Sequence, residues 1–160
     1  MIKLKSILLE SITDTPEFKR WFGNSKVVDG DGNPLIMYHA TPKAGFNVFR
    51  SKSHFGTFNQ ANNKTIEGFY YDASGLPVRN QKVAIYPVYL KIENPKRIKD
   101  VLDNWDLEIE KAKKEKYDGI VYENEYEGAG DSWVVFKSNQ VKSAIGNNGQ
   151  FNLNNTDITK

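Results

Sequence analysis

The sequence contains no cysteine, and only two of its 160 residues are histidine. The lack of cysteine excludes disulfide bonds, thiolate nucleophiles and zinc sites that use cysteine. No carboxylate stands at ligand spacing from either histidine, so we expect no metal cofactor. No serine lies in a Gly-x-Ser-x-Gly elbow, and neither of the glycine-rich phosphate-binding patterns occurs. Several common kinds of catalytic and nucleotide site are therefore not supported.

Long apolar runs and a marked excess of charge are missing as well. Twenty-two basic residues stand against 20 acidic ones, and the net charge of +2 predicts no general attraction to nucleic acid or to membranes. Hydrophobic residues make up 39% and charged residues 26% of the chain, a balance typical of globular proteins. The chain is long enough to bury a core without disulfides. We therefore expect one globular domain that is monomeric, cytoplasmic and not bound to a membrane.

The local patterns predict short strands and few helices. The segment "TPEFKRWFG" predicts a helix that Thr15 caps and Gly23 ends. A second, charged helix is expected over residues 103–117. Pro87 indicates an edge position or a bulge within the clearest strand. Strands are expected over residues 26–40 (two around an Asp-Gly turn), 82–95, 118–125 and 131–136. Without βαβ repetition, this order predicts an α+β fold with a largely antiparallel sheet.

Both histidines stand next to strand or turn signals. In "PLIMYHATP", residues 34–42, His39 follows an apolar run and is either a hydrogen-bonded core residue or a group at the edge of a site. His54 opens "HFGTFNQANNK", in which Thr57 predicts the start of a helix. His54 is either a surface residue that caps the turn or a ring that contacts a ligand.

A third segment, "YENEYEGAGDSW", gathers carboxylates between two expected strands: Glu123, Glu125, Glu127 and Asp131. Strand alternation directs the three glutamates to one side for as long as the segment stays extended. The segment is either a solvated acidic turn or one wall of a site.

In this order the segments resemble ADP-ribosyltransferases of the diphtheria-toxin and poly(ADP-ribose) polymerase branch, and most closely the small domains of phage polyvalent proteins. "LIMYHATP" is similar to the branch's His-Gly-Ser/Thr strand, and "HFGTFNQAN" to its Tyr-Phe-Ala segment. "DSWVVFKSNQVKSAI" is similar to its Glu-Tyr-Ile-Val-Tyr strand and the Gln-Val that follows. "YPVYLKIENPKRI" and "YDGIVYENE" resemble the phage domains themselves. The resemblance covers most of residues 24–151 and implies a split antiparallel β-sheet core with a few flanking helices.

The resemblance also implies that NAD is the substrate. Under it, His39 binds a ribose hydroxyl, and the N–H and C=O of Ala40 bind the nicotinamide carboxamide. Thr41 adds a hydroxyl nearby. A strand that ends in unpaired backbone groups suits this task, because the frame that holds them is rigid.

His54 and Phe55 stand where the branch stacks a tyrosine ring on nicotinamide. An imidazole stacks less well than a phenol ring, so Phe55, Phe58, Tyr70 or Tyr71 is expected to supply a second ring. Thr57 and Gln60 either bind the carboxamide or only cap a helix.

The chain departs from the branch at Ser132, which aligns with the branch's catalytic glutamate. A carboxylate there stabilises the positive charge that develops on the ribose while the nicotinamide bond breaks. The phage domains carry an Asn-Glu-x-Glu element before this strand, so Glu127 is expected to stabilise the charge and Glu125 to polarise the acceptor. Alternation turns Asp131 away from Ser132. Ser132 is expected to keep a hydrogen bond to ribose or carboxamide.

The implied function is a phage-encoded mono-ADP-ribosyltransferase that modifies a host protein or nucleic acid in the host cytoplasm. The alternatives are an NAD glycohydrolase, or a degenerate NAD-binding module packaged in a virion. We expect the transferase domain at residues 13–151 and a flexible tail at 152–160. Residues 1–12 are either an amphipathic helix or a targeting peptide, because Leu8-Leu9-Glu10 resembles a site at which some phages trim such peptides.

Overall fold

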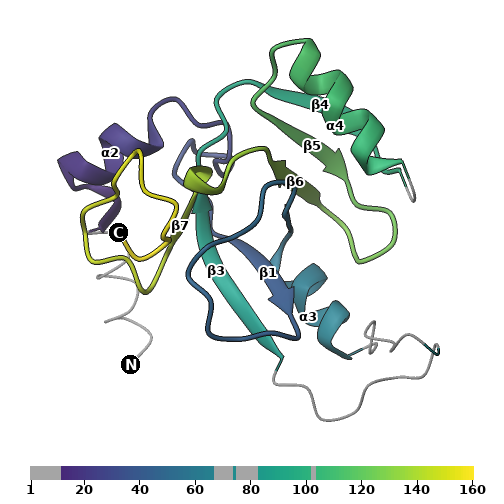
Figure 1. The fold of residues 1–160 in the computed structure, drawn as a ribbon, viewed down its shortest axis with the longest axis horizontal. Coiled ribbons are helices and arrows are strands. Elements are labelled where there is room, and N and C mark those ends of the chain that lie inside the picture. Colours follow the sequence, from purple (N-terminus) through teal and green to yellow (C-terminus); the bar gives the residue numbers. More distant parts are fainter. Residues whose placement is uncertain (1–11, 67–73, 75–82, 102–103) are drawn as a thin grey trace.

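Two small β-sheets form the core of the computed structural model, which describes residues 12–66, 74, 83–101 and 104–160 (Figure 1). One sheet has the strand order β1-β3-β7: Met37–Thr41, Ala84–Leu90 and Val141–Ser143. The other has the order β2-β6-β5-β4: His54–Phe55, Asp131–Val135, Gly119–Glu123 and Pro95–Lys99. Paired strands in the described chain are antiparallel except for β4 and β5. The predicted α+β class, with a split and largely antiparallel sheet core, is confirmed.

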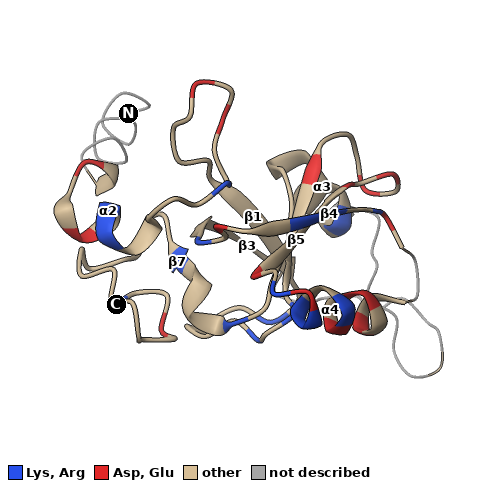
Figure 2. Ribbon diagram, turned by 90° about the horizontal axis from the view of Figure 1, so that it is seen from above, with Lys and Arg blue, Asp and Glu red and all other residues tan. Residues whose placement is uncertain are grey.

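Helices flank the sheets in the described chain: α2 (Pro16–Phe22), α3 (Phe58–Ile66), α4 (Trp105–Lys114) and the short 3-10 helix η1 (Ser138–Gln140). Helix α2 begins and ends as predicted, because Thr15 Oγ1 accepts the N–H of Phe18 at 3.2 Å and Gly23 ends the helix with a φ of 58°. Helix α4 buries Ile109 and Ala112. Its outer surface carries both signs of charge (Figure 2), as expected for a solvated face.

Strand β4 is not predicted by the sequence patterns. It is short and charged, and its side chains do not alternate between apolar and polar. It runs parallel to β5, and α4 connects the two strands, so one βαβ unit lies within this otherwise antiparallel sheet. The strand expected over residues 82–95 ends at Leu90 instead. The Asp118 carboxylate then accepts the N–H groups of Glu93 and Asn94 at 2.7 and 2.8 Å, which turns the chain toward β4.

Pro87 lies inside β3, the middle strand of its sheet, so the expected edge position is wrong. Its partner Tyr38 exchanges backbone hydrogen bonds with Gly56, not with β3, so Tyr38 and Pro87 form a non-hydrogen-bonded pair. The backbone of Pro87 faces β7, where its C=O accepts the N–H of Ala144 at 3.0 Å. Proline has no N–H to donate toward β7, and this lack falls directly before Val88, where the β3–β7 ladder ends.

The hairpin expected in residues 26–40 is reduced to one bridge between Val28 and Pro34. Asp29 Oδ1 accepts the N–H groups of Asp31 and Asn33, both at 2.9 Å, and so closes the Asp-Gly turn. Strand β1 pairs with β3, and its first residue, Met37, is buried in the core.

Residues 152–160, for which the sequence predicts a flexible tail, contact the core in the structure. Ile158 is only 2% exposed and belongs to the same hydrophobic cluster as the central strands. The buried Lys142 Nζ donates to the carbonyls of Asn155 and Asp157 at 2.9 and 3.0 Å. These contacts fix the end of the chain against β7.

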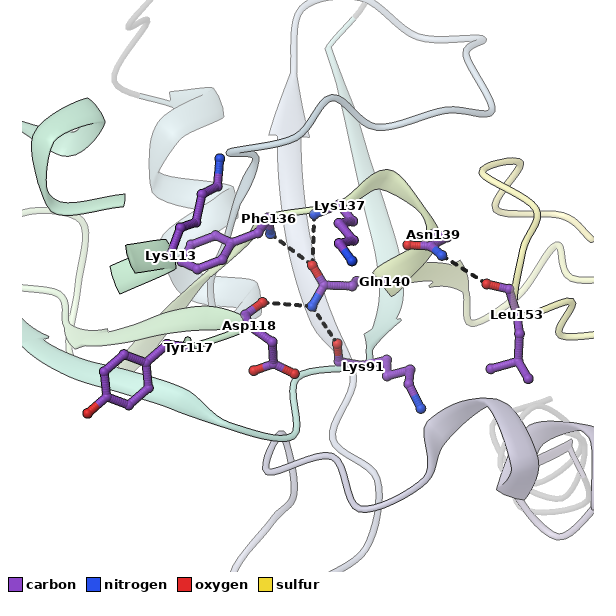
Figure 3. Close-up of a pocket in the computed structure, with 9 residues that line it drawn as sticks. All are labelled: Lys91, Lys113, Tyr117, Asp118, Phe136, Lys137, Asn139, Gln140 and Leu153. Atoms are coloured by element: carbon purple, nitrogen blue, oxygen red, sulfur yellow. Dashed lines mark hydrogen bonds between the residues drawn. The ribbon is translucent and has the colours of Figure 1, made fainter. Parts of the chain in front are cut away.

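Gln140 joins the two sheets (Figure 3). Its Oε1 accepts the N–H groups of Phe136 and Lys137, both at 2.8 Å, directly after β6. Its Nε2 donates to the carbonyl of Lys91, after β3, and to that of Asp118, before β5, at 2.9 and 2.8 Å. All four bonds bind backbone groups, so this side chain fixes the positions at which three strands begin or end. The hollow beside it, about 470 Å³, contains none of the predicted site residues.

Some expectations concern residues that the structure does not describe, among them the N-terminal helix or targeting peptide, of whose residues 1–12 only Ile12 is described, and the rings of Tyr70 and Tyr71. Within the described ranges, no helix combines the length and the apolar character that a membrane span needs. The same ranges contain no group of three or more histidine, cysteine, aspartate or glutamate side chains placed to hold a metal ion.

Candidate functional site

His39 lies at the centre of β1, and its ring packs against the aromatic rings of Phe49 and Phe55. Its Nδ1 lies 2.6 Å from the carbonyl oxygen of His54. Burial lowers the pKa of His39, and the charge of Lys64 adds to this effect, so the ring is neutral at pH 7. The carbonyl requires the proton on Nδ1, which leaves Nε2 as a hydrogen-bond acceptor.

The backbone of Ala40 faces away from β3. Tyr38, two residues earlier, directs its N–H and C=O to Gly56, with bonds of 2.8 and 2.9 Å. Because the direction of backbone groups repeats every second residue in an antiparallel ladder, the N–H and C=O of Ala40 point to the same side. The neighbouring strand β2 does not pair with Ala40, since the His54 carbonyl there binds His39 instead. An amide that offers one donor and one acceptor therefore borders the cleft described below.

His54 is enclosed by two further aromatic rings. Its Nδ1 lies 3.0 Å from Tyr122 Oη, and its ring contacts Trp105 edge-on at 4.5 Å between centroids. Burial is the main cause that lowers the pKa of His54 to about 4, with smaller contributions from Lys64 and His39. His54 is thus a neutral, half-buried part of the wall and not the surface turn cap that was one of the two interpretations.

This burial predicts a dependence of stability on pH. Between pH 6.5 and about 4 the unfolded chain binds a proton at His54 and the folded chain does not, so stability falls as the pH falls. From pH 7.5 to pH 5, the 1.5 pH units below 6.5 correspond to a loss of about 2 kcal/mol in the free energy of unfolding. Urea denaturation at the two pH values measures this loss. The variant His54→Phe should lose about 2 kcal/mol less, and an equal loss in both proteins would contradict the assignment.

Helix α3 begins with a reciprocal pair of hydrogen bonds. The N–H of Thr57 donates to Gln60 Oε1 at 2.8 Å, and the N–H of Gln60 donates to Thr57 Oγ1 at 3.2 Å. The predicted helix start at Thr57 is confirmed. Gly56 lies beneath the Gln60 side chain, where an added Cβ would collide with Oε1.

The same helix holds the acidic loop between β5 and β6. Gln60 Nε2 donates to the carbonyls of Gly128 and Gly130 at 2.8 and 3.0 Å. Asn63 Nδ2 donates to the carbonyl of Glu127 at 2.9 Å. The segment is therefore a fixed wall next to β1 and β2 and not a freely solvated turn.

Glu127 is the carboxylate that this loop turns inward. Its Oε1 lies 2.6 Å from Lys64 Nζ on α3, and its Oε2 accepts a hydrogen bond from Asn124 Nδ2 at 2.9 Å. Asn124 Oδ1 also accepts the Glu127 N–H at 2.8 Å. The side-chain amide of Asn124 therefore binds both the backbone and the carboxylate of Glu127. With 24% of its side chain exposed, Glu127 is held on two sides and still reaches solvent.

Ser132 is 2% exposed and fully engaged in a polar network. Its hydroxyl donates to Gln60 Oε1 at 3.0 Å and accepts from Asn124 Nδ2 at 3.1 Å. The side chain therefore links the helix that holds the loop to the asparagine that orients Glu127. A longer anionic side chain at this position would meet the oxygen of Gln60.

Three adjoining hollows meet at His39. The central cleft, about 20 Å³, is lined by residues from five elements and the acidic loop, among them His39, Ala40, His54, Phe55, Glu127 and Ser132. The aromatic hollow, about 430 Å³, shares Tyr122 with the central cleft and adds Trp105, Tyr126 and Asp100. The basic hollow, about 560 Å³, contains Thr41, Lys43 and Arg50. The central cleft is narrow where Lys64 and Glu127 form their ion pair, whereas the outer two have room for a larger molecule.

Six of the predicted residues thus lie together in the central cleft, and Thr41 borders the adjoining basic hollow. Thr57 lines none of the three hollows described above and caps α3 instead. Glu125 is exposed and also lies outside them. Asp131 forms a two-bond contact with Arg97, at 3.0 and 2.7 Å, on the side away from Ser132.

Sequence reasoning missed four residues of these walls: Lys64, Asp100, Tyr122 and Arg50. Lys64 follows Gln60 by one helical turn, which was a usable signal once α3 was predicted. Asp100 follows the unpredicted β4, so nothing in the sequence connects it with Glu127.

A family model described as ADP-ribosyltransferase in polyvalent proteins matches the chain in two overlapping segments, residues 29–106 and 96–151. The two segments contain every residue of the central cleft named above. No curated protein and no solved structure matches the chain.

Proposed function

This chain belongs to the family of ADP-ribosyltransferases in polyvalent proteins, and from this premise we propose that it is a phage-encoded mono-ADP-ribosyltransferase. It transfers ADP-ribose from NAD to a host macromolecule and releases nicotinamide. The observation that carries the proposal is the meeting of His39, the free Ala40 amide and Glu127 at one cleft.

The residues present suit NAD in three respects. His39 Nε2 is an acceptor for a ribose hydroxyl, since Nδ1 is already bound to a carbonyl. The Ala40 amide matches the carboxamide of nicotinamide, which also offers one acceptor and donors. In the basic hollow, Lys43 and Arg50 form no ion pair within the described residues, and their charges suit a diphosphate. Thr41, in the same hollow, supplies a hydroxyl.

Glu127 is the group best suited to the chemical step. Cleavage of the bond between ribose C1′ and the nicotinamide nitrogen leaves positive charge on the ribose, and a nearby carboxylate stabilises that charge. Ser132 cannot supply an anion, but through Asn124 it orients Glu127. His54 forms the aromatic side of the cleft against which the nicotinamide ring is held, whereas Phe55 is 1% exposed and belongs to the hydrophobic core.

Ser132 also supports a second candidate, a module that binds NAD without turnover, because its hydroxyl replaces the glutamate of the larger branch. Hydrolysis of NAD, with water as acceptor, uses the same cleft. The retained Glu127, inward and half-buried, favours an enzyme over the binding module.

The test is the release of nicotinamide from NAD by the purified protein, beside His39→Ala. We expect release by the wild type and a loss of at least about tenfold in the variant, since one hydrogen bond to the ribose is removed from a desolvated site. Thermal melting with and without NAD shows whether each protein folds and binds. A wild type that NAD stabilises without nicotinamide release would establish the binding module. If the wild type neither releases nicotinamide nor is stabilised by NAD, both the enzyme and the binding module are excluded.

A further inference from the structure

The aromatic hollow lies directly beyond Glu127 and His54, which line both it and the central cleft. Both of its lysines are already neutralised: Lys52 Nζ lies 2.7 Å from an oxygen of Asp106, and Lys64 is paired with Glu127. The remaining charged group is Asp100, at the end of β4.

Asp100 has no cation as a partner among the described residues. Its Oδ2 accepts a long bond of 3.3 Å from the N–H of Glu125, and the N–H of Val101 is a further backbone donor. Burial raises the pKa of Asp100, and the charges of Glu127 and Glu125 raise it further, as expected for a half-buried carboxylate that lacks a positive partner. A cationic ligand would supply that partner.

The other walls of this hollow are aromatic. Trp105 and Tyr122 lie 4.6 Å apart between ring centroids, and Tyr126 is 58% exposed. Aromatic faces beside a carboxylate are the environment that a guanidinium group prefers, because it stacks on rings and donates two parallel hydrogen bonds. A nucleic-acid acceptor would need unpaired cations for its phosphates, and both lysines here are paired.

We propose that the aromatic hollow binds the guanidinium group of an arginine side chain as the acceptor of ADP-ribose, and that Asp100 receives its proton. The inference rests on the proposed function. In the step, the bond between C1′ and nicotinamide breaks, and its electron pair leaves with nicotinamide. A guanidinium nitrogen forms the new bond to C1′ and gives one proton to Asp100, which passes it to solvent. The product keeps the positive charge of the guanidinium.

The test uses agmatine, a small guanidinium compound, with putrescine as the ligand that lacks the guanidinium. Calorimetric titration should show agmatine binding to the wild type and to Glu123→Gln, a variant of an exposed carboxylate at the end of the neighbouring strand β5. Asp100→Asn should bind it at least about tenfold more weakly, the loss expected for a charged hydrogen bond. Putrescine should bind weakly to all three proteins.

Turnover separates this inference from the proposed function. With NAD and agmatine, mass spectrometry should find agmatine that carries one ADP-ribose from the wild type and at least about tenfold less from Asp100→Asn. Nicotinamide release without agmatine is measured for both proteins, and the yield of modified agmatine is compared relative to that release. Nicotinamide release without modified agmatine, or modification of an added oligonucleotide instead, would overturn the acceptor assignment and leave the proposed function standing. Absence of nicotinamide release would overturn the proposed function and the transfer step. The titration would then still decide whether the hollow is a guanidinium site.

Discussion

The variant Glu127→Gln should release nicotinamide about 10²- to 10³-fold more slowly than the wild type, the loss typical when one preorganised electrostatic group is removed. The glutamine keeps the shape of the side chain and an oxygen that can accept from Asn124, so the loop should keep its conformation. Only the negative charge is lost, and that charge matters most when the ribose becomes positive. We expect the rate to fall while the Kd for NAD changes by less than about threefold.

Single-turnover kinetics with excess enzyme measures the chemical step directly. Glu123→Gln, which removes an exposed carboxylate at the end of β5, is the matched control and should leave the rate within about twofold of the wild type. Equal rates for Glu127→Gln and the control would show that the carboxylate is not needed. The same assay with Glu125→Gln examines the sequence-based expectation that this residue polarises the acceptor.

The variant Gln140→Ala should lower the free energy of unfolding by about 4 kcal/mol. The carboxamide makes four bonds to backbone groups of three strand ends, and its removal leaves these groups without their partner in a buried setting. Each buried polar group that loses its partner costs about 1 kcal/mol or more.

Urea denaturation at pH 7.5 measures this effect. Asn139→Ala is the control, because Asn139 is the neighbouring residue and makes one exposed bond to the carbonyl of Leu153 at 2.9 Å (Figure 3). It should cost less than about 1 kcal/mol. If the two variants lose the same stability, Gln140 does not join the sheets in the way the hydrogen bonds indicate.

The elements that the sequence predicts well are those with local causes. Helix α2 has a cap at Thr15, a proline in its first turn and an aromatic face, all within nine residues. The capping pair of Thr57 and Gln60 is equally local. Strand β4 has no such signal, because charged residues at the edge of a sheet depend on pairing with β5, which is distant in sequence.

The residues of the candidate site differ in the same way: those with a local sequence pattern were predicted, and those that depend on tertiary structure were not. His39 and Glu127 were predicted because their segments carry recognisable patterns in the right order. Asp100 and Lys64 reach the candidate site only through tertiary structure, Asp100 from the end of β4 and Lys64 from α3. The side of the acidic loop that faces inward also depends on α3, since alternation alone would treat Glu125 and Glu127 alike.

Under the proposed function, the ion pair between Lys64 and Glu127 gives the free protein a cation close to where positive charge develops on the ribose. The Glu127 carboxylate is thereby paired, and only 24% of its side chain is exposed, before any ligand arrives, so the proposed chemical step does not begin by stripping an isolated carboxylate of its hydration. Under the proposed function, the positive ribose must take the place of the Lys64 ammonium group beside Glu127. Displacing this group costs binding free energy, whereas its presence holds the carboxylate in position. The same ion pair therefore influences both the affinity for the substrate and the rate of the chemical step.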